Sequence, residues 1–418
     1  MAAALGVLVS CGSVKSGEEV VAASRDSKVV VAYVTSWSEV MPDPQYMTHI
    51  NYAFGHVNES FNGVKIDNEE RLRQIVDLRK QKPELKVLLS IGGWGSGRFS
   101  EMAANDEYRR AFAADCDRVV KEFALDGIDI DWEYPTSSMA NISSSPDDTE
   151  NFTLLMQDIR AAIGNEKELT LATVASARYI DFKAILPSVD FVNIMAYDMA
   201  SAPKHHSALY PSGHSGDITS DGAVTAHLKA GVPPSKLVMG MPFYGRGGDG
   251  YPSFQDYNKV GNTDTQYTEK WDEVAQVPYL ADKNDTLVFG FENPRSLAIK
   301  CQYILDKDLL GGMYWDYSGD NEQGDLRRTV AENLLGKPHK AKVLVLTERG
   351  GQHGGFTDAG LKWLAAEGAK GNFSITEINN ARNITEAYLS QFSLVIQLDF
   401  PPYTWPKEAE DAFVKYIE

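Results

Sequence analysis

Alternating carboxylates are the most informative feature of this sequence. The stretch from Asp126 to Glu133 reads Asp-Gly-Ile-Asp-Ile-Asp-Trp-Glu. Side chains of a β-strand point alternately to opposite faces, so Asp129, Asp131 and Glu133 share one face of a strand here. Crowded carboxylates repel each other and lose hydration, so some of them must share protons or gain hydrogen bonds. A carboxylic acid whose pKa is raised in this way is suited to protonating a leaving-group oxygen.

Two other interpretations compete for this acidic face. A divalent metal ion would also bind clustered carboxylates, but no second acidic or histidine cluster follows a neighbouring strand in the sequence. An exposed antiparallel strand would carry a solvated acidic face, whereas the flanking pattern predicts a parallel strand that is covered on both sides. We therefore expect the acidic face to point into the protein and to hold neither a metal ion nor another cofactor.

Short β-rich runs alternate with longer helical patterns from Lys28 onward. The expected strands are 29–35, 49–54, 86–91, 127–132, 169–174, 191–196, 237–243 and 312–315, and the expected helices include 68–81, 106–123, 149–163, 222–230 and 294–305. Eight such units over about 310 residues match a TIM (β/α)8 barrel in number and size. A doubly wound sheet also alternates strands and helices, so the pattern alone leaves both folds open.

The longest expected connections all follow strands and precede helices. In a TIM barrel such loops gather at the C-terminal mouth, where active sites are built. They are residues 134–148, 199–221 and 245–289. The second of them contains His205, His206 and His214, whose spacing fits no pair of metal ligands on a helix or a strand. We interpret these histidines as ordinary loop residues.

The acidic strand also carries a family resemblance. It resembles the DxxDxDxE signature of glycoside hydrolase family 18, the chitinases and their relatives, at every defined position. One stretch before the acidic strand and three after it resemble barrel segments of the same family, in the order Leu89–Trp94, Asn193–Asp198, Gly240–Arg246 and Gly312–Trp315. The resemblance covers about residues 28–335 and implies a TIM-barrel hydrolase. It further implies cleavage of β-1,4 bonds next to N-acetylglucosamine in chitin or related oligosaccharides, with retention of configuration.

The resemblance implies roles for single residues as well. Glu133 would be the general acid and then the general base, Asp131 would orient the N-acetyl group of the substrate, and Asp129 would tune Asp131 from beneath. The acetamido oxygen of the substrate itself would be the nucleophile. The other implied contacts are Tyr197, which would hold the acetamido group, Asp198, Met195, Tyr244, Arg246, Tyr33, Phe54, Trp94 and Trp315.

Packing inside the barrel is an alternative role for several of these side chains, namely Tyr33, Phe54, Met195, Tyr197 and Trp315. Trp94 lies in a glycine-rich turn and is poorly placed for a core. The sequence also departs from relatives that insert an α+β subdomain between the seventh and eighth strands. Because Gly247–Leu310 is short and must supply the last helix, we expect one wall of the groove to be missing and long-chain processivity to be in doubt.

Two alternative activities remain at this point. An endo-β-N-acetylglucosaminidase acting on N-glycan cores would tolerate a shortened cleft wall, although the Tyr197–Asp198 pair favours a chitinase. A chitinase-like carbohydrate-binding protein would typically have lost the acid residue, whereas Glu133 is present.

Composition excludes other classes of function. The chain has 418 residues, of which 43% are hydrophobic and 23% charged, as in ordinary globular domains. A net charge of −18 repels phosphate backbones, so we expect no nucleic-acid partner. A neutral polysaccharide would not be repelled. Cys116 and Cys301 fall in helical patterns and are expected to be buried thiols.

The two ends of the chain carry separate patterns. Residues 1–27 begin with an apolar run that ends in Leu8-Val9-Ser10-Cys11, which resembles a bacterial lipoprotein signal without its basic start. We expect export, a flexible tether and possible membrane attachment through a lipidated Cys11, in the periplasm or at the outer membrane or cell surface of a bacterium. No apolar run is long enough to span a membrane.

A second βα pattern begins after a linker at 336–340. Residues 341–418 resemble the beginning of the ThuA-like, glutamine-amidotransferase-like α/β domains, in strand order and in the glycine-rich stretch Glu348–Gly355. That stretch could equally be a flexible loop. We expect a partial flavodoxin-like segment with three parallel strands and an open sheet edge, to which we assign no activity.

Overall fold

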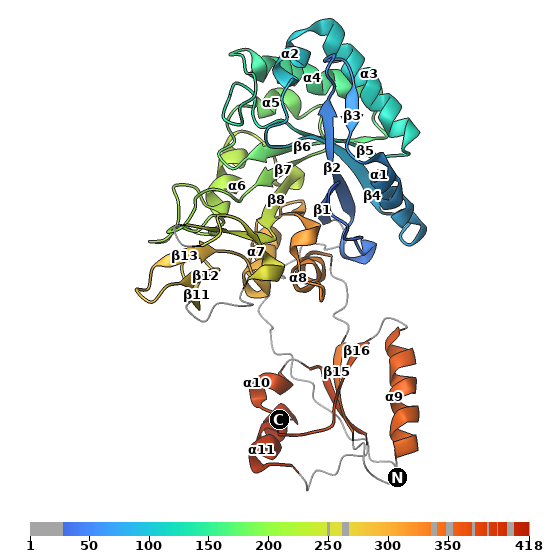
Figure 1. Ribbon diagram of the computed structural model, residues 1–418, viewed down its shortest axis with the longest axis vertical. Coiled ribbons are helices and arrows are strands. Elements are labelled where there is room, and N and C mark those ends of the chain that lie inside the picture. The colour runs from blue at the N-terminus through green and yellow to red at the C-terminus, as the bar shows by residue number, and fades with distance from the viewer. Residues whose placement is uncertain are drawn as a thin grey trace, which may run out of the picture.

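The computed structural model describes residues 28–248, 251–260, 267–335, 341–347, 354–369, 373–382, 384–390, 392–398 and 405–417. Its main feature is a closed barrel of parallel strands, formed by β1 (Val29–Thr35), β2 (His49–Val57), β4 (Lys86–Gly92), β5 (Gly127–Asp131), β6 (Glu168–Val174), β7 (Phe191–Met195), β8 (Leu237–Pro242) and β14 (Gly311–Trp315). Because β1 pairs with β2 on one side and with β14 on the other, the sheet closes on itself (Figure 1). The predicted TIM barrel is confirmed, and a doubly wound sheet is excluded.

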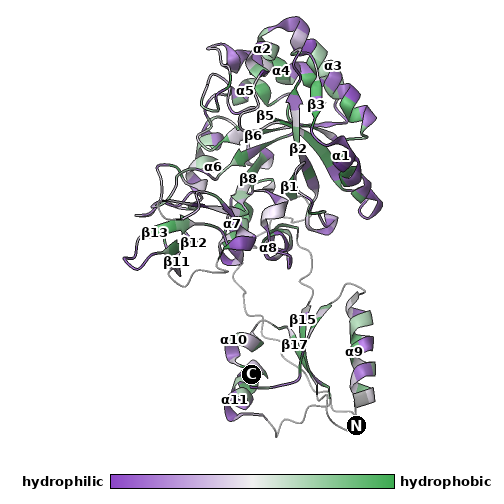
Figure 2. Ribbon diagram, in the orientation of Figure 1, coloured by the Kyte–Doolittle hydropathy of each residue, from purple (hydrophilic) through white to green (hydrophobic). Residues whose placement is uncertain are grey.

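Helices cover the outside of the barrel. They are α1 (Glu69–Val76), α2 (Phe99–Ala104), α3 (Asp106–Glu122), α4 (Asp148–Ile163), α5 (Phe182–Ile185), α6 (Ser220–Lys229), α7 (Pro294–Asp306) and α8 (Asp325–Leu334). Asn105 caps α3 by accepting hydrogen bonds from two backbone N–H groups of its first turn. Figure 2 shows the barrel strands largely green and α1 with long purple stretches, as expected for a core covered by amphipathic helices. Cys116 and Cys301 are buried free thiols, as predicted.

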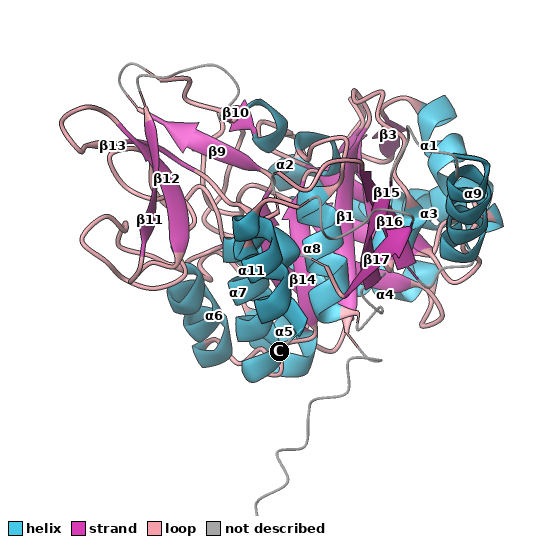
Figure 3. Cartoon of the chain, turned by 90° about the horizontal axis from the view of Figure 1, so that it is seen from below, coloured by secondary structure: helices cyan, strands magenta, loops and turns pink. Residues whose placement is uncertain are grey.

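The segment between β8 and α7 corrects one expectation. It forms a five-stranded antiparallel sheet of β9 (Tyr244–Gly247), β10 (Gln255–Asp256), β11 (Thr268–Asp272), β12 (Val277–Ala281) and β13 (Leu287–Gly290). Figure 3 shows these strands as a group of their own beside the barrel. The expectation that this stretch is a loop followed by the last helix was therefore wrong, and the described residues between β8 and Pro294 form strands and no α-helix. Leu280, Val288, Phe289 and Phe291 give this insert its own apolar cluster, and the last helix needs only the residues from Pro294 on.

The C-terminal unit has a small parallel sheet in the order β16–β15–β17, with β15 at Ala341–Thr347, β16 at Phe373–Ile378 and β17 at Leu394–Leu398. In Figure 1, α9 (Gly354–Ala369) lies on one side of this sheet, and α10 (Glu386–Leu389) and α11 (Lys407–Ile417) lie on the other. Val343 and Val345 pack with Leu364 of α9, while Leu344 and Leu346 belong to the opposite cluster. The three predicted parallel strands are confirmed.

Several sequence-based expectations fall outside the described residues. These are the lipoprotein-like segment 1–27 with Cys11, the linker 336–340 and most of the glycine-rich stretch after β15. Within the described ranges, no helix is both long and apolar enough to cross a membrane.

Candidate active site

The acidic face of β5 points into the barrel, as the alternating pattern predicted. Ile128 and Ile130 lie in the core between the barrel and its helices, while Asp129 and Asp131 are buried on the inward side. Asp131 is the last residue of β5, and Glu133 follows beyond its C-terminal end. The strand therefore places three carboxyl groups at successive depths, from the barrel interior to its mouth.

Asp129 is held at the bottom of this series. Its carboxylate accepts four hydrogen bonds, with distances of 2.8 Å from Tyr33, 2.8 Å from Ser90, 2.6 Å from Thr170 and 3.3 Å from Asn193. Burial raises the pKa of Asp129, and these four donors oppose that rise. The donors occupy both oxygens, so the side chain is fixed beneath Asp131.

Asp131 and Glu133 hold protons more tightly than ordinary carboxyl groups. Burial raises the pKa of Asp131 well above its usual range, and the negative charges of Glu133 and Asp129 raise it further. One Asp131 oxygen has no hydrogen-bond partner among the described residues. Burial also raises the pKa of Glu133, to about 7, with a hydrogen bond from Tyr134 acting in the opposite direction. At neutral pH the site therefore contains a carboxylic acid with an available proton.

Across the mouth, β7 and β9 supply a second polar group. Arg246 donates two hydrogen bonds of 2.6 Å each to the Asp198 carboxylate. These bonds, together with His206, hold the pKa of Asp198 well below its usual range. Tyr197 precedes Asp198 and is partly buried, and its hydroxyl group contacts the Met313 sulfur at 3.7 Å. The pair of Asp198 and Arg246 thus presents a fixed, paired charge near the three carboxyl groups.

Aromatic rings form the floor and the entrance of the site. Trp315 ends β14 and stacks on Phe54 with ring centroids 5.5 Å apart, and Tyr33 lies 5.5 Å from the same indole ring. Trp37 and Trp94 are exposed, at 64% and 61% of their surface. Exposed tryptophans around a buried aromatic floor are suited to stacking against the apolar faces of sugar rings.

A cavity of 670 Å³ connects these groups. The predicted site residues that line it are Tyr33, Phe54, Trp94, Asp131, Glu133, Met195, Tyr197, Asp198, Tyr244, Arg246 and Trp315. Asp129 does not line the cavity, in keeping with its place beneath Asp131. The residues that we singled out for this cleft are thus brought together, and the packing role considered for Tyr33 and Phe54 coexists with a place in the cavity wall.

Sequence reasoning missed other lining residues, among them Trp37, Tyr134, Arg178, Tyr179 and Phe254. Tyr134 stacks on Tyr179 with ring centroids 5.4 Å apart. Its position directly after Glu133 was the sequence signal that could have placed it at the site. Phe254 comes from the β9–β10 connection and stacks on Tyr244 at 4.7 Å. It was missed because the insert was interpreted as a loop.

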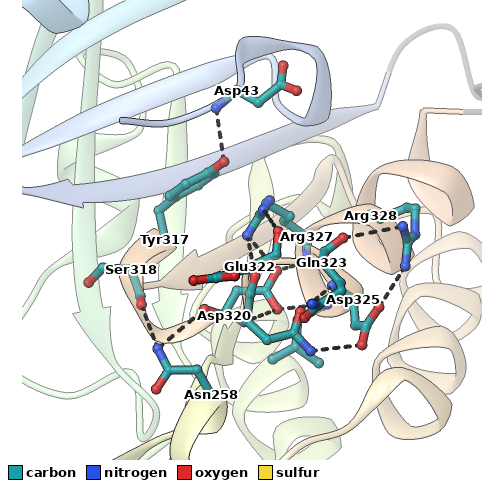
Figure 4. A network of polar contacts seen from close by, with 12 residues as sticks. Asp43, Asn258, Tyr317, Ser318, Asp320, Glu322, Gln323, Asp325, Arg327 and Arg328 are labelled. Carbon is teal, nitrogen blue, oxygen red and sulfur yellow. Dashed lines mark hydrogen bonds and ion pairs between the residues drawn. The ribbon is translucent and has the colours of Figure 1, made fainter. Parts of the chain in front are cut away.

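The chain after Trp315 is fixed by a polar network around Asp320 (Figure 4). The Asp320 carboxylate accepts hydrogen bonds from the backbone N–H groups of Leu326 and Arg327, at 3.1 and 2.9 Å, and so holds the start of α8. The Asn258 side chain donates to the carbonyl oxygen of Ser318 at 3.2 Å. The network links the insert to the strand end that carries the indole floor.

The three loop histidines do not converge on one point. His205 faces Asp272 at 3.2 Å, and its ring lies 6.1 Å from that of His214. His206 faces Asp198 instead, at 3.5 Å. No group of three His, Cys, Asp or Glu side chains within the described part of the chain is arranged to hold a metal ion.

Comparison with known proteins identifies the barrel. The model of the family "Glycosyl hydrolases family 18" matches residues 29–320. The chain belongs to glycoside hydrolase family 18. Because its relatives include many chitinases, the barrel domain is a glycoside hydrolase of the chitinase type.

Individual relatives show how far the likeness extends. Chitinase A1 of Niallia circulans is 30% identical, and the match covers 72% of this chain but only 58% of that protein. Chitotriosidase-1 of Mus musculus is 31% identical, with 71% of this chain and 74% of that protein covered. The solved structure of a family 18 N-acetylglucosaminidase from Paenibacillus barengoltzii has a TM-score of 0.68 at 32% identity, covering 73% of this chain and 99% of that one.

Proposed function

We propose that this family 18 enzyme hydrolyses β-1,4 bonds next to N-acetylglucosamine in chitin or its oligosaccharides. The observation that carries the proposal is Glu133, a carboxylic acid with a pKa of about 7 at the edge of an aromatic-lined cavity. A neutral, ring-stacking substrate suits this cavity and the negative net charge of the chain. The named activities of the relatives support the same substrate class.

Glu133 would act first as the general acid. Its raised pKa keeps the proton in place near neutral pH, so that it can pass to the glycosidic oxygen as the bond breaks. The resulting carboxylate would then accept a proton from the water that completes hydrolysis. One residue thereby serves both steps of a reaction that retains configuration.

The nucleophile would be the acetamido oxygen of the substrate. Asp131 is the last residue of β5 and is buried beneath Glu133, so we do not assign it the attack on the sugar. It can instead orient the N-acetyl group and stabilise the positive charge that develops there. Tyr197 also lines the cavity and would hold the acetamido group.

The test is the variant Glu133→Gln, which keeps the shape of the side chain but removes the transferable proton. Hydrolysis of chitin oligosaccharides should fall by at least about 10²-fold, as for loss of a general acid. Oligosaccharide binding, measured by calorimetry, should remain. Glu107→Gln, on the exposed face of α3, is the matched control and should retain full activity. Turnover by Glu133→Gln close to that of the wild type would refute the role of Glu133.

Comparison of products would test the substrate class. Chitin oligosaccharides and an N-glycosylated protein should be offered to the same enzyme preparation. We expect cleavage of the former and no release of glycans from the latter. The reverse result would favour an endo-β-N-acetylglucosaminidase.

We also propose that residues 1–27 export the protein and attach it to a membrane through lipidated Cys11. The resemblance of Leu8–Cys11 to a lipoprotein signal supports this proposal. Metabolic labelling with a palmitate analogue should mark the wild type and leave Cys11→Ser unmarked. For residues 341–418 we propose a ThuA-like α/β unit, supported by three parallel strands with helices on both sides.

A further inference from the structure

A fully buried ion pair lies behind the wall of the cavity. Lys300 of α7 and Glu292, just before that helix, form a salt bridge, and their side chains are 0% and 1% exposed. Desolvating two charges costs more than their attraction usually returns, so such a pair is weak evidence for stability alone. Its retention in the interior suggests that it holds something in place.

What the pair holds is the chain at Ser207. The Ser207 hydroxyl group donates to Glu292 at 2.6 Å, and the Lys300 ammonium group donates to the Ser207 carbonyl oxygen. Both the backbone and the side chain of this loop residue are thereby fixed against α7. His206 precedes Ser207, and its own carbonyl oxygen accepts a hydrogen bond of 3.0 Å from the backbone N–H of Met199.

The side chain of His206 lies against Asp198. The Nδ1 atom of His206 lies 3.5 Å from the Asp198 carboxylate and 3.5 Å from the backbone N–H of Asp198. Its ring packs against Tyr244 with centroids 5.4 Å apart. The other ring nitrogen, Nε2, is buried without a hydrogen-bond partner among the described residues. The polar contact of His206 is thus with Asp198, which lines the cavity, while His206 itself does not line it.

We infer that His206, anchored by the buried Lys300–Glu292 pair through Ser207, is a positioning residue that holds the Asp198–Arg246 pair in its working geometry. The inference rests on the proposed function, because Asp198 acts on the reacting groups of that mechanism. The Asp198 charge raises the pKa of Glu133 and faces Tyr197. A loosened Asp198 would therefore disturb the chemical step, whereas the aromatic rings that bind sugar would stay in place.

Three substitutions of His206 separate positioning from packing. In His206→Asn, the side-chain amide carries an acceptor and a donor near the place of Nδ1, so both contacts with Asp198 can persist. In His206→Gln, the amide extends toward the place of Nε2, where the described residues offer no hydrogen-bond partner. In His206→Leu, both contacts are lost while the volume is largely retained.

We expect kcat for a chromogenic chitobioside to fall about tenfold in His206→Gln and His206→Leu, since small displacements near reacting groups have effects of this size or larger. KM should change less than twofold. His206→Asn should keep kcat within about threefold of the wild type. Equal kcat in all three variants, or a loss that appears only in KM, would overturn the inference.

His205 offers a matched control on the same loop. It is also buried, but its Nε2 atom faces Asp272, away from Asp198. His205→Leu, which loses the contact with Asp272, should therefore leave kcat unchanged. A tenfold loss of kcat in His205→Leu would show that any disturbance of the loop has this effect, and would overturn the specific role of His206.

A double replacement tests the anchor. Lys300→Met alone would leave the Glu292 charge buried and unpaired, so Lys300→Met is combined with Glu292→Gln. We expect this double variant to fold and to lose about as much kcat as His206→Leu, with no further loss when His206→Leu is added. If adding His206→Leu to the double variant multiplied the two losses of kcat, the anchor and His206 would act independently, and the inference would be overturned. A wild type that does not cleave the chitobioside would instead overturn the proposed function, and the inference with it.

Discussion

The Glu133 carboxyl group has two neighbours that move its pKa in opposite directions. The negative charge of Asp198 raises it, and the hydrogen bond from the Tyr134 hydroxyl group lowers it. Burial is the largest contribution and brings the pKa to about 7. An acid with this pKa is protonated below neutral pH and loses its proton as the pH rises through about 7. We therefore expect the activity to decline on the basic side of neutrality.

Replacing Asp198 or Tyr134 should move the basic limb of the pH–activity profile in opposite directions. Asp198→Asn removes a negative charge and leaves Arg246 unpaired, so the pKa of Glu133 should fall and the limb should move to lower pH. Tyr134→Phe removes the hydrogen bond that stabilises the carboxylate, so the limb should move to higher pH. The measurement is the pH dependence of kcat in each variant, and Asp147→Asn, on an exposed loop, should leave the limb in place. Shifts of the same sign in Asp198→Asn and Tyr134→Phe would contradict this account.

At the scale of elements, the buried strands of the barrel could be predicted and the short strands of the insert could not. The alternation around Asp129 predicted a buried parallel strand correctly, because burial on both faces leaves a direct mark on the sequence. The insert β9–β13 was missed because its strands are short and lie in a stretch that the sequence analysis interpreted as a loop. Trp37 was missed for a related reason, since it lies in the connection after β1, where no periodic pattern exists.

Gly92, at the end of β4, lies directly against the end of β5, the strand that carries Asp131. Its φ angle is +133°, and a Cβ atom added there would lie 1.9 Å from the carbonyl oxygen of Asp131. The next residue, Gly93, donates its N–H to the same oxygen at 2.8 Å. The close approach fixes the backbone of the strand end that carries the catalytic carboxyl groups.

Gly92→Ala should therefore destabilise the fold and impair activity together. Strain at a positive φ and overlap with a backbone atom should lower the free energy of unfolding by about 3 kcal/mol or more. Gly97→Ala, in the same turn, is the control, because the nearest atom to the added methyl group, in the Ile142 side chain, would be 3.7 Å away. Urea denaturation of the two variants measures the difference. A Gly92→Ala protein as stable as Gly97→Ala would show that the strand end can relax.

At the scale of the whole molecule, the catalytic groups and the C-terminal sheet belong to separate cores. The buried residues of the main barrel cluster lie between Val30 and Leu334. Those of the two C-terminal clusters lie between Val343 and Ala412. The composition change at 336–340 favours this division, since residues 341–418 carry a strand-and-helix pattern of their own. It could not predict which cavity residues the connections would add.

Separate cores predict that the barrel works without the second unit. Deleting residues 341–418 should leave hydrolysis of a chromogenic chitobioside within about twofold, since domains with their own cores fold independently. It should also reduce aggregation, because the outer strands β16 and β17 each pair on only one side within the described residues. Activity and light scattering of the shortened and full-length chains provide the measurement. Loss of the barrel fold in the shortened chain would show that the second unit supports the first, and that the two cores are not separate in stability.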